Sequence, residues 1–542
     1  MRTIKHFQLR LWLYLIITLI GTSLKFYKVD FRYFWFDEIC SIEHTSGLTG
    51  YQTYQLIPKN EIKNITYYKD LLHLNSQNYT IGSQLKGLSR MTNLNPLHYE
   101  VLVFWHRIVG DDDVDYRLFN VFLFILTLPF LFLLAKTLFK SDLSGWIAVS
   151  LFAVSPFFHY YAHEARYNIL LTFLLIVNNY LFLMAINDNK IKWWTGYLIV
   201  GILALYASIV AGIVIIGHLI YIMIFKKELR IRYFISVFLI LIGYLPWLIS
   251  VIDNRNEISA ALSWHSWYGT NQNFVKLIIA QLTIMARSYV TLNNFWDHMS
   301  LLIYNKFDGN YIQICAMVLI IFTILCSVIY AFRKLNHKVS FFLALIILPQ
   351  FLLFLLSDLF RGTGSSLIYR YHLINILGAL LFITFLISRK ISLGKLIYSF
   401  IYTGLIILGL FSILLISKDR CWDVPLNCEN NIEDARLFSS SNRPLLITDC
   451  RLPLNIGIGG FMAIMNECTS NSIDIMQTSQ DVTRIKEKIP EKYYSEVYLV
   501  YATDELVNNM KLQFGEKMDS LEIEGISPIW QINLDENNLS EN

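Results

Sequence analysis

Two acidic residues next to an aromatic cluster are the first candidates for chemistry. Asp37 and Glu38 directly follow the segment 34–36, which reads Phe-Trp-Phe. At a membrane surface, such a carboxylate could take a proton from an incoming hydroxyl and act as a general base. The structural alternative is an interfacial aromatic belt beside two solvated acids.

A second segment combines a carboxylate with a guanidinium group. Glu164 and Arg166 are two residues apart in the stretch 159–167, between two apolar runs. The functional interpretation is a second carboxylate facing Asp37, with the arginine binding a phosphate or orienting an acid. The structural alternative is a local ion pair that closes the loop.

Two further arginines stand where apolar runs begin. Arg370 lies between Tyr369 and Tyr371, and its planar guanidinium suits phosphate oxygens at headgroup depth. Arg117 holds a similar place at the second apolar run. A snorkelling anchor is the alternative for Arg370, and pairing with the acids of the segment 111–115 is the alternative for Arg117.

The composition indicates the solvent in which these residues work. The chain has 542 residues, of which 55% are hydrophobic and 16% are charged, against roughly 25% charged in an average domain. This excludes a disordered or collagen-like protein and does not fit a purely soluble enzyme. The segment 418–542 has a net charge of −10, so the rest carries +14. We therefore predict a membrane domain over 1–417 and an aqueous domain over 418–542.

Eleven apolar runs are long enough to predict transmembrane helices. The stretch 193–225 would rise about 50 Å as one helix, so we divide it at Ala207-Ser208. The runs lie at 9–25, 117–139, 143–160, 168–186, 193–207, 208–225, 233–252, 311–332, 339–357, 369–388 and 396–416.

The distribution of Lys and Arg predicts the orientation. With the N-terminus in the cytoplasm, 17 basic residues fall on the inner side, beside only three acids. An odd number of spans then places the C-terminal domain outside. No A-x-A-like site follows the first run, so we interpret it as an uncleaved anchor. We expect a bacterial inner membrane protein.

The outer segments differ in length and character. The first outer loop, 26–116, has some 90 residues, and loops of that length are usually functional. Within it, the segment 97–107 is too short and polar to span the membrane and suits a helix in the interface. Carboxylates and arginines thus gather on one membrane face. None lies clearly at mid-membrane, which disfavours a proton-coupled transporter and favours an enzyme acting on a lipid-linked phosphate.

The C-terminal domain is predicted to be a small α/β unit. The segments 444–449 and 497–502 are typical of buried strands, 521–524 of a half-exposed strand, and 479–492 of a helix. Four cysteines of this domain predict two disulfides in any of three pairings, with a zinc site as the alternative. They are Cys421, Cys428, Cys450 and Cys468.

At this point the ordered motifs resemble a known family. The chain is similar to the polyprenyl-phosphate-sugar-dependent glycosyltransferases of the GT-C fold, in the branch of the protein O-mannosyltransferases and the lipid A aminoarabinose transferases. The likeness covers about residues 1–390. Its motifs are Trp35-Phe36-Asp37-Glu38, Asn95-Pro96-Leu97-His98-Tyr99, Gly110-Asp111 with Tyr116-Arg117-Leu118, Ser155-Pro156 with His163-Glu164-Ala165-Arg166, and Tyr369-Arg370-Tyr371.

The resemblance implies a fold, an activity and roles for residues. It implies a polytopic helical membrane protein of about 11 spans that transfers a sugar, with inversion, from a polyprenyl-phosphate donor to a hydroxyl of a lipid, glycan or protein acceptor. Asp37 would be the base, supported by Glu38, with Glu164 as a second acid. Arg166 and Arg370 would hold the carrier phosphate, and we count Tyr371, His98 and Arg117 among the substrate-binding residues. No nucleic acid partner is expected.

The chain also departs from the family pattern. Many relatives have Pro-Pro where this chain has Asn95-Pro96, and Tyr where it has His98. The resemblance leaves a divalent metal near this loop open, and His98, Glu100 and His163 are the residues that could hold it here. No metal site is assigned, and the acceptor stays open.

Two other functions compete with the transferase. A transporter or flippase for a lipid-linked glycan would need a polar path through the spans. A non-catalytic assembly or sensor protein would use the acidic C-terminal domain as its receptor.

Overall fold

The structure is a computed structural model of the chain. It describes residues 2–46, 55–73, 81–88, 96–110, 112–255, 273–292, 311–421, 425–449, 454–479, 481–490, 492–521 and 529–534. The chain forms two compact units. The first comprises Met1–Phe31, Ser89–Val101 and Asp112–Asp419, and the second comprises Arg32–Leu88, Leu102–Asp111 and Arg420–Asn542.

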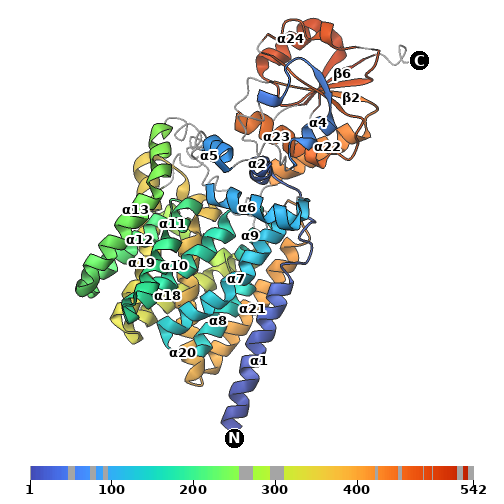
Figure 1. The fold of residues 1–542 in the computed structure, drawn as a ribbon. Coiled ribbons are helices and arrows are strands. Elements are labelled where there is room, and N and C mark those ends of the chain that lie inside the picture. The colour runs from blue at the N-terminus through green and yellow to red at the C-terminus, as the bar shows by residue number, and fades with distance from the viewer. Residues whose placement is uncertain are drawn as a thin grey trace. The chain divides into compact units, whose positions relative to one another are not determined.

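The first unit is a bundle of apolar helices, which run side by side in Figure 1. Each of the eleven predicted runs coincides with helical structure, and α11 ends at Ala207, where the long apolar stretch was divided. The helices are α1 (Arg2–Ser23), α7 (Asp113–Phe139), α8 (Asp142–Ala153), α9 (Pro156–Ala162), α10 (Asn168–Asp188), α11 (Ile191–Ala207), α12 (Ala211–Phe225), α13 (Arg230–Asp253), α16 (Phe274–Arg287), α18 (Tyr311–Lys334), α19 (His337–Arg361), α20 (Leu373–Ser392) and α21 (Leu396–Ile416).

Not all of these helices are long enough to cross a bilayer alone. Among the described residues, seven helices pass by length and composition, and an eighth does if α8 and α9, bent by 60° at their break, count as one span. Leu11–Ser23, α11 and α12 are apolar but shorter. The 15 residues of α12 rise only about 23 Å, less than a hydrocarbon core of about 30 Å.

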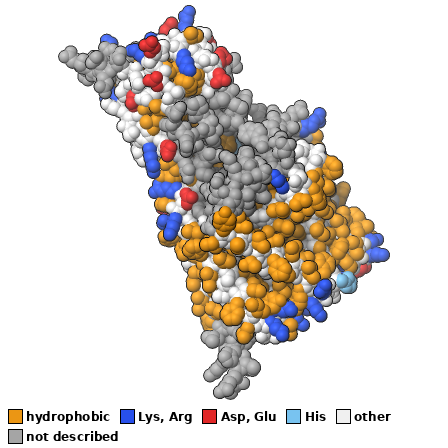
Figure 2. Space-filling view, turned by 180° about the vertical axis from the view of Figure 1, so that it is seen from behind, with side chains coloured by type: hydrophobic (Ala, Val, Ile, Leu, Met, Phe, Trp, Pro, Cys, Tyr) orange, Lys and Arg blue, Asp and Glu red, His pale blue; other side chains and the backbone are white. Residues whose placement is uncertain are grey.

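The surface of the bundle is suited to lipid. Figure 2 shows hydrophobic side chains covering much of one face of the helical body. Phe238, Phe322 and Phe400 are among the exposed large hydrophobic residues. Exposed apolar side chains are stable in hydrocarbon, so the predicted integral membrane protein is confirmed.

One group of polar side chains inside the bundle forms a hydrogen-bonded cluster. Tyr197 Oη lies 3.2 Å from His218 Nδ1 and donates to Tyr233 Oη at 3.3 Å, and His218 Nε2 lies 3.2 Å from Asn179 Oδ1. Such interhelical hydrogen bonds join α10, α11, α12 and α13. His218 is thus an ionisable residue inside an apolar helix, which the sequence interpretation did not identify.

Helix α6 (Pro96–Val109) confirms the predicted short helix at 97–107. Phe104 and Ile108 are exposed by 66% and 68%, whereas His98, Tyr99 and Leu102 are buried. One side of α6 therefore offers apolar groups outward and the other packs inside, as expected of an interfacial helix.

The second unit is built around a six-stranded sheet of order β1-β3-β2-β4-β6-β5. β2 is parallel to β3 and to β4, and β6 is antiparallel to β4 and β5. The strands are β1 (Ile62–Asn64), β2 (Pro444–Thr448), β3 (Asp474–Gln477), β4 (Glu496–Leu499), β5 (Met518–Leu521) and β6 (Ile529–Asn533). The helices are α2 (Phe36–Thr45), α4 (Ile65–Asp70), α5 (Ile81–Leu88), α22 (Pro425–Ser440), α23 (Leu454–Glu467) and α24 (Asp504–Phe514).

The predicted α/β character of the C-terminal region is confirmed, with differences in detail. The segments 444–449 and 497–502 form β2 and β4, and β2 is buried along its whole length, as a central parallel strand should be. Residues 522–524 lie outside the described residues. The helix expected over 479–492 is wrong, because residues 481–490 hold only a short 3₁₀ turn. The Asp481 carboxylate accepts from Thr483 N and Oγ1, a local bond that competes with helix formation.

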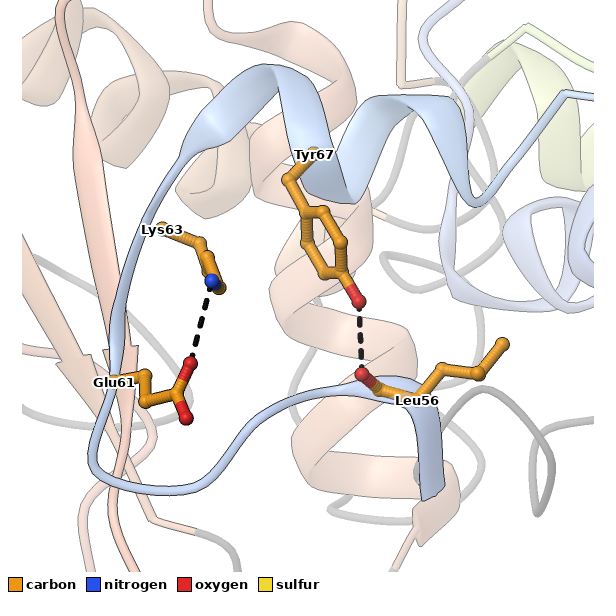
Figure 3. Close-up of polar contacts among 4 residues, drawn as sticks. All are labelled: Leu56, Glu61, Lys63 and Tyr67. Carbon is orange, nitrogen blue, oxygen red and sulfur yellow. Dashed lines mark hydrogen bonds and ion pairs between the residues drawn. The ribbon is translucent and has the colours of Figure 1, made fainter.

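The first outer loop supplies a strand to this sheet. β1 pairs antiparallel with β3, with Ile62 opposite Met476 and Asn64 opposite Asp474. Figure 3 shows how the surrounding segment is closed. Tyr67 Oη donates to the carbonyl oxygen of Leu56 at 2.8 Å, and Lys63 Nζ lies 3.3 Å from Glu61 Oε2. The C-terminal fold therefore incorporates residues that lie more than 350 positions earlier in the chain.

The two predicted disulfides of the C-terminal region are wrong. Cys421 is disulfide-bonded, but Cys468 is a buried free thiol. Cys40, Cys315 and Cys326 are likewise outside any disulfide. The side chain of Cys428 and the whole of Cys450 lie outside the described residues.

Candidate functional site

Arg117 is placed by the first turns of α7. Asp112 caps the helix in a capping box with Asp115, which orients the next turn. Arg117 is only 1% exposed, and its Nη1 donates to the carbonyl oxygen of Val29 at 3.2 Å. The guanidinium is therefore a fixed, buried cation at this end of α7.

The segment between α9 and α10 carries Glu164 and Arg166. The Asn120 side chain, on α7, donates from Nδ2 to the carbonyl oxygens of Glu164 and of Arg166, the latter at 3.0 Å. Glu164 is buried, and its Oε2 accepts from Asn168 Nδ2 at 3.1 Å. Arg166 is half-buried, with its guanidinium carbon 5.8 Å from the Tyr167 ring. One amide thus fixes the backbone at both functional residues.

The segment with Arg370 is held by the end of α19. Asp358 accepts three hydrogen bonds, from Thr363 Oγ1 at 2.6 Å, Ser365 N at 2.9 Å and Ser366 N at 2.7 Å. These bonds to a carboxylate fold the loop that leads into the 3₁₀ turn Tyr369–His372. Asp358 is thus a residue that the sequence analysis missed.

Residues in the body of α19 also hold the 3₁₀ turn Tyr369–His372. Gln350 Nε2 donates to the carbonyl oxygen of Tyr371 at 2.5 Å, and the Tyr371 ring packs 6.1 Å from Phe354. Arg370 is half-buried, with its guanidinium carbon 5.8 Å from the Tyr371 ring. Arg370 therefore projects from a turn that is held on both sides.

Aromatic contacts join these segments within the first unit. The Tyr369 ring lies 4.8 Å from Phe157 and 6.2 Å from Tyr161, both on α9. The Arg287 guanidinium, fully buried at the end of α16, lies 5.4 Å from the same Tyr369 ring. Helix α9, which leads into the segment with Glu164 and Arg166, thus meets the Tyr369 turn and the end of α16. Sequence reasoning missed Arg287, although one arginine after the apolar run 277–286 was a visible signal.

His98 belongs to the same unit but sits in a different setting. Its ring is buried, 5.4 Å from Tyr99 and 6.0 Å from Phe119 on α7. His98 therefore contacts the helix that carries Arg117 and Asn120.

The residues considered for a divalent metal do not fit one. No group of three or more His, Cys, Asp or Glu in the described part of the chain could hold an ion, and His98, Glu100 and His163 are all described. His163 instead places Nε2 2.8 Å from the carbonyl oxygen of Lys25, so that this nitrogen donates, and its ring lies 4.4 Å from His159. We derive no metal-dependent step.

Asp37 and Glu38 belong to the second unit. They occupy the first turn of α2, where negative charge is favoured by the helix dipole. Asp37 is half-buried and Glu38 is 3% exposed. The first turn of α2 therefore fixes the backbone of both residues. The other predicted site residues belong to the first unit.

Comparison with known proteins adds a family and a fold. Residues 95–250 match the family described as dolichyl-phosphate-mannose-protein mannosyltransferase. The chain superimposes on ArnT of Cupriavidus metallidurans bound to undecaprenyl phosphate with a TM-score of 0.54 at 10% sequence identity, covering 98% of this chain and 99% of that one. The chain has the fold of the GT-C glycosyltransferases.

Other comparisons are weaker. Apo ArnT from the same organism gives a TM-score of 0.42 at 12% identity, covering 98% of this chain and 99% of that one. The oligosaccharyltransferase of Archaeoglobus fulgidus gives 0.48 at 10% identity, covering 90% of this chain and 69% of that one. Among curated proteins, none matches this sequence. The predicted resemblance to GT-C glycosyltransferases is nevertheless confirmed by the family match and the ArnT fold together.

Proposed function

We propose that this protein is a membrane glycosyltransferase that moves a sugar from a polyprenyl-phosphate donor to an acceptor hydroxyl on the extracytoplasmic face. One observation carries the proposal. The family match, 95–250, contains the ordered segment with Glu164 and Arg166, and the whole chain has the fold of a protein that binds undecaprenyl phosphate. Both comparisons therefore support the same class of donor.

The reaction is an inverting displacement. The acceptor oxygen attacks the anomeric carbon, the bond from that carbon to the phosphate oxygen breaks, and the acceptor proton passes to the Asp37 carboxylate. Polyprenyl phosphate leaves as an anion, so cationic residues stabilise the departing charge more than protonation would. Arg166 and Arg370 are the residues to which we assign the phosphate, because each is half-buried on a fixed backbone.

The other predicted residues have supporting roles. Glu38 supports Asp37, and Glu164 is the second acid, while Arg117, Tyr371 and His98 complete the substrate-binding set. Arg117 and His98 are buried, so they act by shaping the site rather than from its surface. We place the N-terminus in the cytoplasm and the second unit on the extracytoplasmic side.

The test is transfer by the full-length protein in membranes supplied with labelled undecaprenyl-phosphate mannose. We expect Asp37→Asn to lower the transfer rate by about 10²–10⁴-fold, since a general base contributes about that much. Asp70→Asn, at an exposed site of the same unit, is the control and should behave as wild type. Normal transfer by a folded Asp37→Asn variant would remove the base assignment. Translocation of the lipid-linked sugar without transfer would instead establish the flippase alternative.

A further inference from the structure

Helix α23 of the second unit contacts three different elements through consecutive residues. A Cβ atom added at Gly459 would lie 2.4 Å from the ring of Phe36, on α2, and one added at Gly460 would lie 2.5 Å from Tyr501 Oη, just after β4. The Phe461 ring lies 6.4 Å from Tyr68, on α4. Side chains would not fit at the two glycines, so the helix backbone itself is the contact surface.

The contact at Gly459 lies at the first residue of α2. Phe36 is the first residue of α2, so the ring that rests on the α23 backbone belongs to the chain neighbour of Asp37. The peptide nitrogen of Phe34 lies 3.4 Å from Glu467 Oε1, at the far end of α23. The start of α2 is therefore held against α23 on both sides of Trp35.

Helix α2 depends on this support. It has 10 residues, and its N-cap, Trp35, makes no side-chain capping bond. Isolated helices shorter than about 12–15 residues are marginal in water, and most helical stability in proteins comes from packing. The orientation of Asp37 thus follows from what α2 packs on.

The same loop is tied to the C-terminal region again further on. Asn64 Nδ2 donates to the carbonyl oxygen of Asn471 at 2.9 Å, and Lys69 Nζ donates to that of Cys468 at 2.7 Å. With the β1–β3 pairing, these bonds fix the loop against residues that immediately follow α23. The Arg32–Leu88 part of the first loop and the C-terminal region thus belong to the same compact unit.

We propose that Gly459 is a positioning residue for Asp37, and that the C-terminal region is a working part of the transferase rather than an appended domain. This inference rests on the proposed function, in which Asp37 is the base. Gly459 acts through Phe36, because a side chain there would push the first turn of α2 away from the α23 backbone. The displaced Asp37 carboxylate would then meet the acceptor hydroxyl in a poorer geometry.

The experiment compares four full-length variants in the same transfer assay. Gly459→Ala is expected to lower kcat at least about tenfold, and to leave the KM for undecaprenyl-phosphate mannose within about twofold. Gly82→Ala is the matched control, since it is a helical glycine of the same unit with nothing within 4 Å of an added Cβ. Phe36→Ala combined with Gly459→Ala frees the crowded space, so the double variant should be no slower than Phe36→Ala alone.

A pH profile separates positioning from simple loss of folded protein. A displaced base should shift the acidic limb of the kcat profile by about 0.5 unit or more, whereas partial unfolding lowers the whole profile without moving it. A wild-type kcat for Gly459→Ala, a uniform drop, or strictly additive effects in the double variant would each overturn the inference. The proposed function fails separately, if Asp37→Asn transfers normally.

Discussion

A single amide on a membrane helix fixes two functional residues at once. Asn120 is fully buried, and its Nδ2 donates to the carbonyl oxygens of Glu164 and Arg166. Buried carbonyl groups need a partner, because leaving one unpaired in an apolar environment costs free energy. No motif singled out Asn120, since its role depends on a segment 44 residues later.

Replacing Asn120 should damage both stability and donor binding. Asn120→Ala removes the amide hydrogen bonds to both carbonyl oxygens, although that of Glu164 still accepts from Arg166 N at 2.7 Å. We expect the free energy of unfolding to fall by about 1–3 kcal/mol. The KM for the lipid-linked donor should rise as Arg166 loses its fixed backbone. Thermal unfolding and transfer kinetics of the purified protein measure both effects.

A residue on the same helix supplies the control. The Thr127 hydroxyl is also buried, but it donates only within α7, to the carbonyl oxygen of Leu123 at 2.8 Å. Thr127→Val should leave the donor KM unchanged. An unchanged KM for Asn120→Ala as well would show that the backbone at Arg166 is held by other contacts.

At the scale of elements, the packing of α22 near α23 creates a titratable site in the second unit. Burial, with a smaller contribution from the negative charge of Glu433, raises the pKa of Asp434 on α22 from 3.8 to about 7. Burial also raises the pKa of the Cys468 thiol, just beyond α23, to about 12. Both groups are therefore favoured in their neutral forms by the fold.

The second unit should lose stability as the pH rises through neutrality. The folded Asp434 holds its proton more tightly than the unfolded one, so its contribution is complete below about pH 4 and is lost as the pH rises through about 7. We expect the unfolding midpoint of this unit, followed by hydrogen exchange in the intact protein, to be lower at pH 8 than at pH 5. Asp434→Asn should flatten this dependence.

An exposed carboxylate tests the specificity of that effect. Hydrogen bonds from Thr483 lower the pKa of Asp481, which is opposite to the shift at Asp434. Asp481→Asn should therefore not change the loss of stability of the second unit between pH 5 and pH 8. If the stability of the second unit in Asp434→Asn still falls steeply between pH 5 and pH 8, a group other than Asp434 is responsible for the fall.

At the scale of the whole molecule, net charge distinguishes the region predicted to lie in the membrane from the region predicted to lie in water. The region before Lys418 carries a net +14 and the remainder −10, and 17 basic residues fall on one side of the predicted topology. Basic loops are retained in the cytoplasm during insertion. We therefore expect a phosphatase reporter, active only outside the cytoplasm, to work when fused after Ser417.

The internal control uses the most basic loop. A fusion within the segment 226–232, which has four basic residues and one acid, should be inactive. Activity at that fusion, or none after Ser417, would reverse the predicted orientation. It would also move the proposed site to the other face of the membrane.

The membrane body could be predicted well from the sequence because its signals are local. Apolar runs determine helices wherever no water can bind the backbone, so the positions of the helices and the break at Ala207 followed directly. The buried strands β2 and β4 were also visible as uninterrupted apolar runs. The family resemblance followed from ordered motifs.

Only the tertiary structure decided what holds these elements together. The membership of β1 in the C-terminal sheet, the support of Phe36 by Gly459 and the amide of Asn120 all join residues far apart in the chain. Each contact depends on geometry that no single segment encodes. Local pattern therefore determined which elements form, while long-range packing determined which of them carry Asp37, Glu164 and Arg370 in fixed positions.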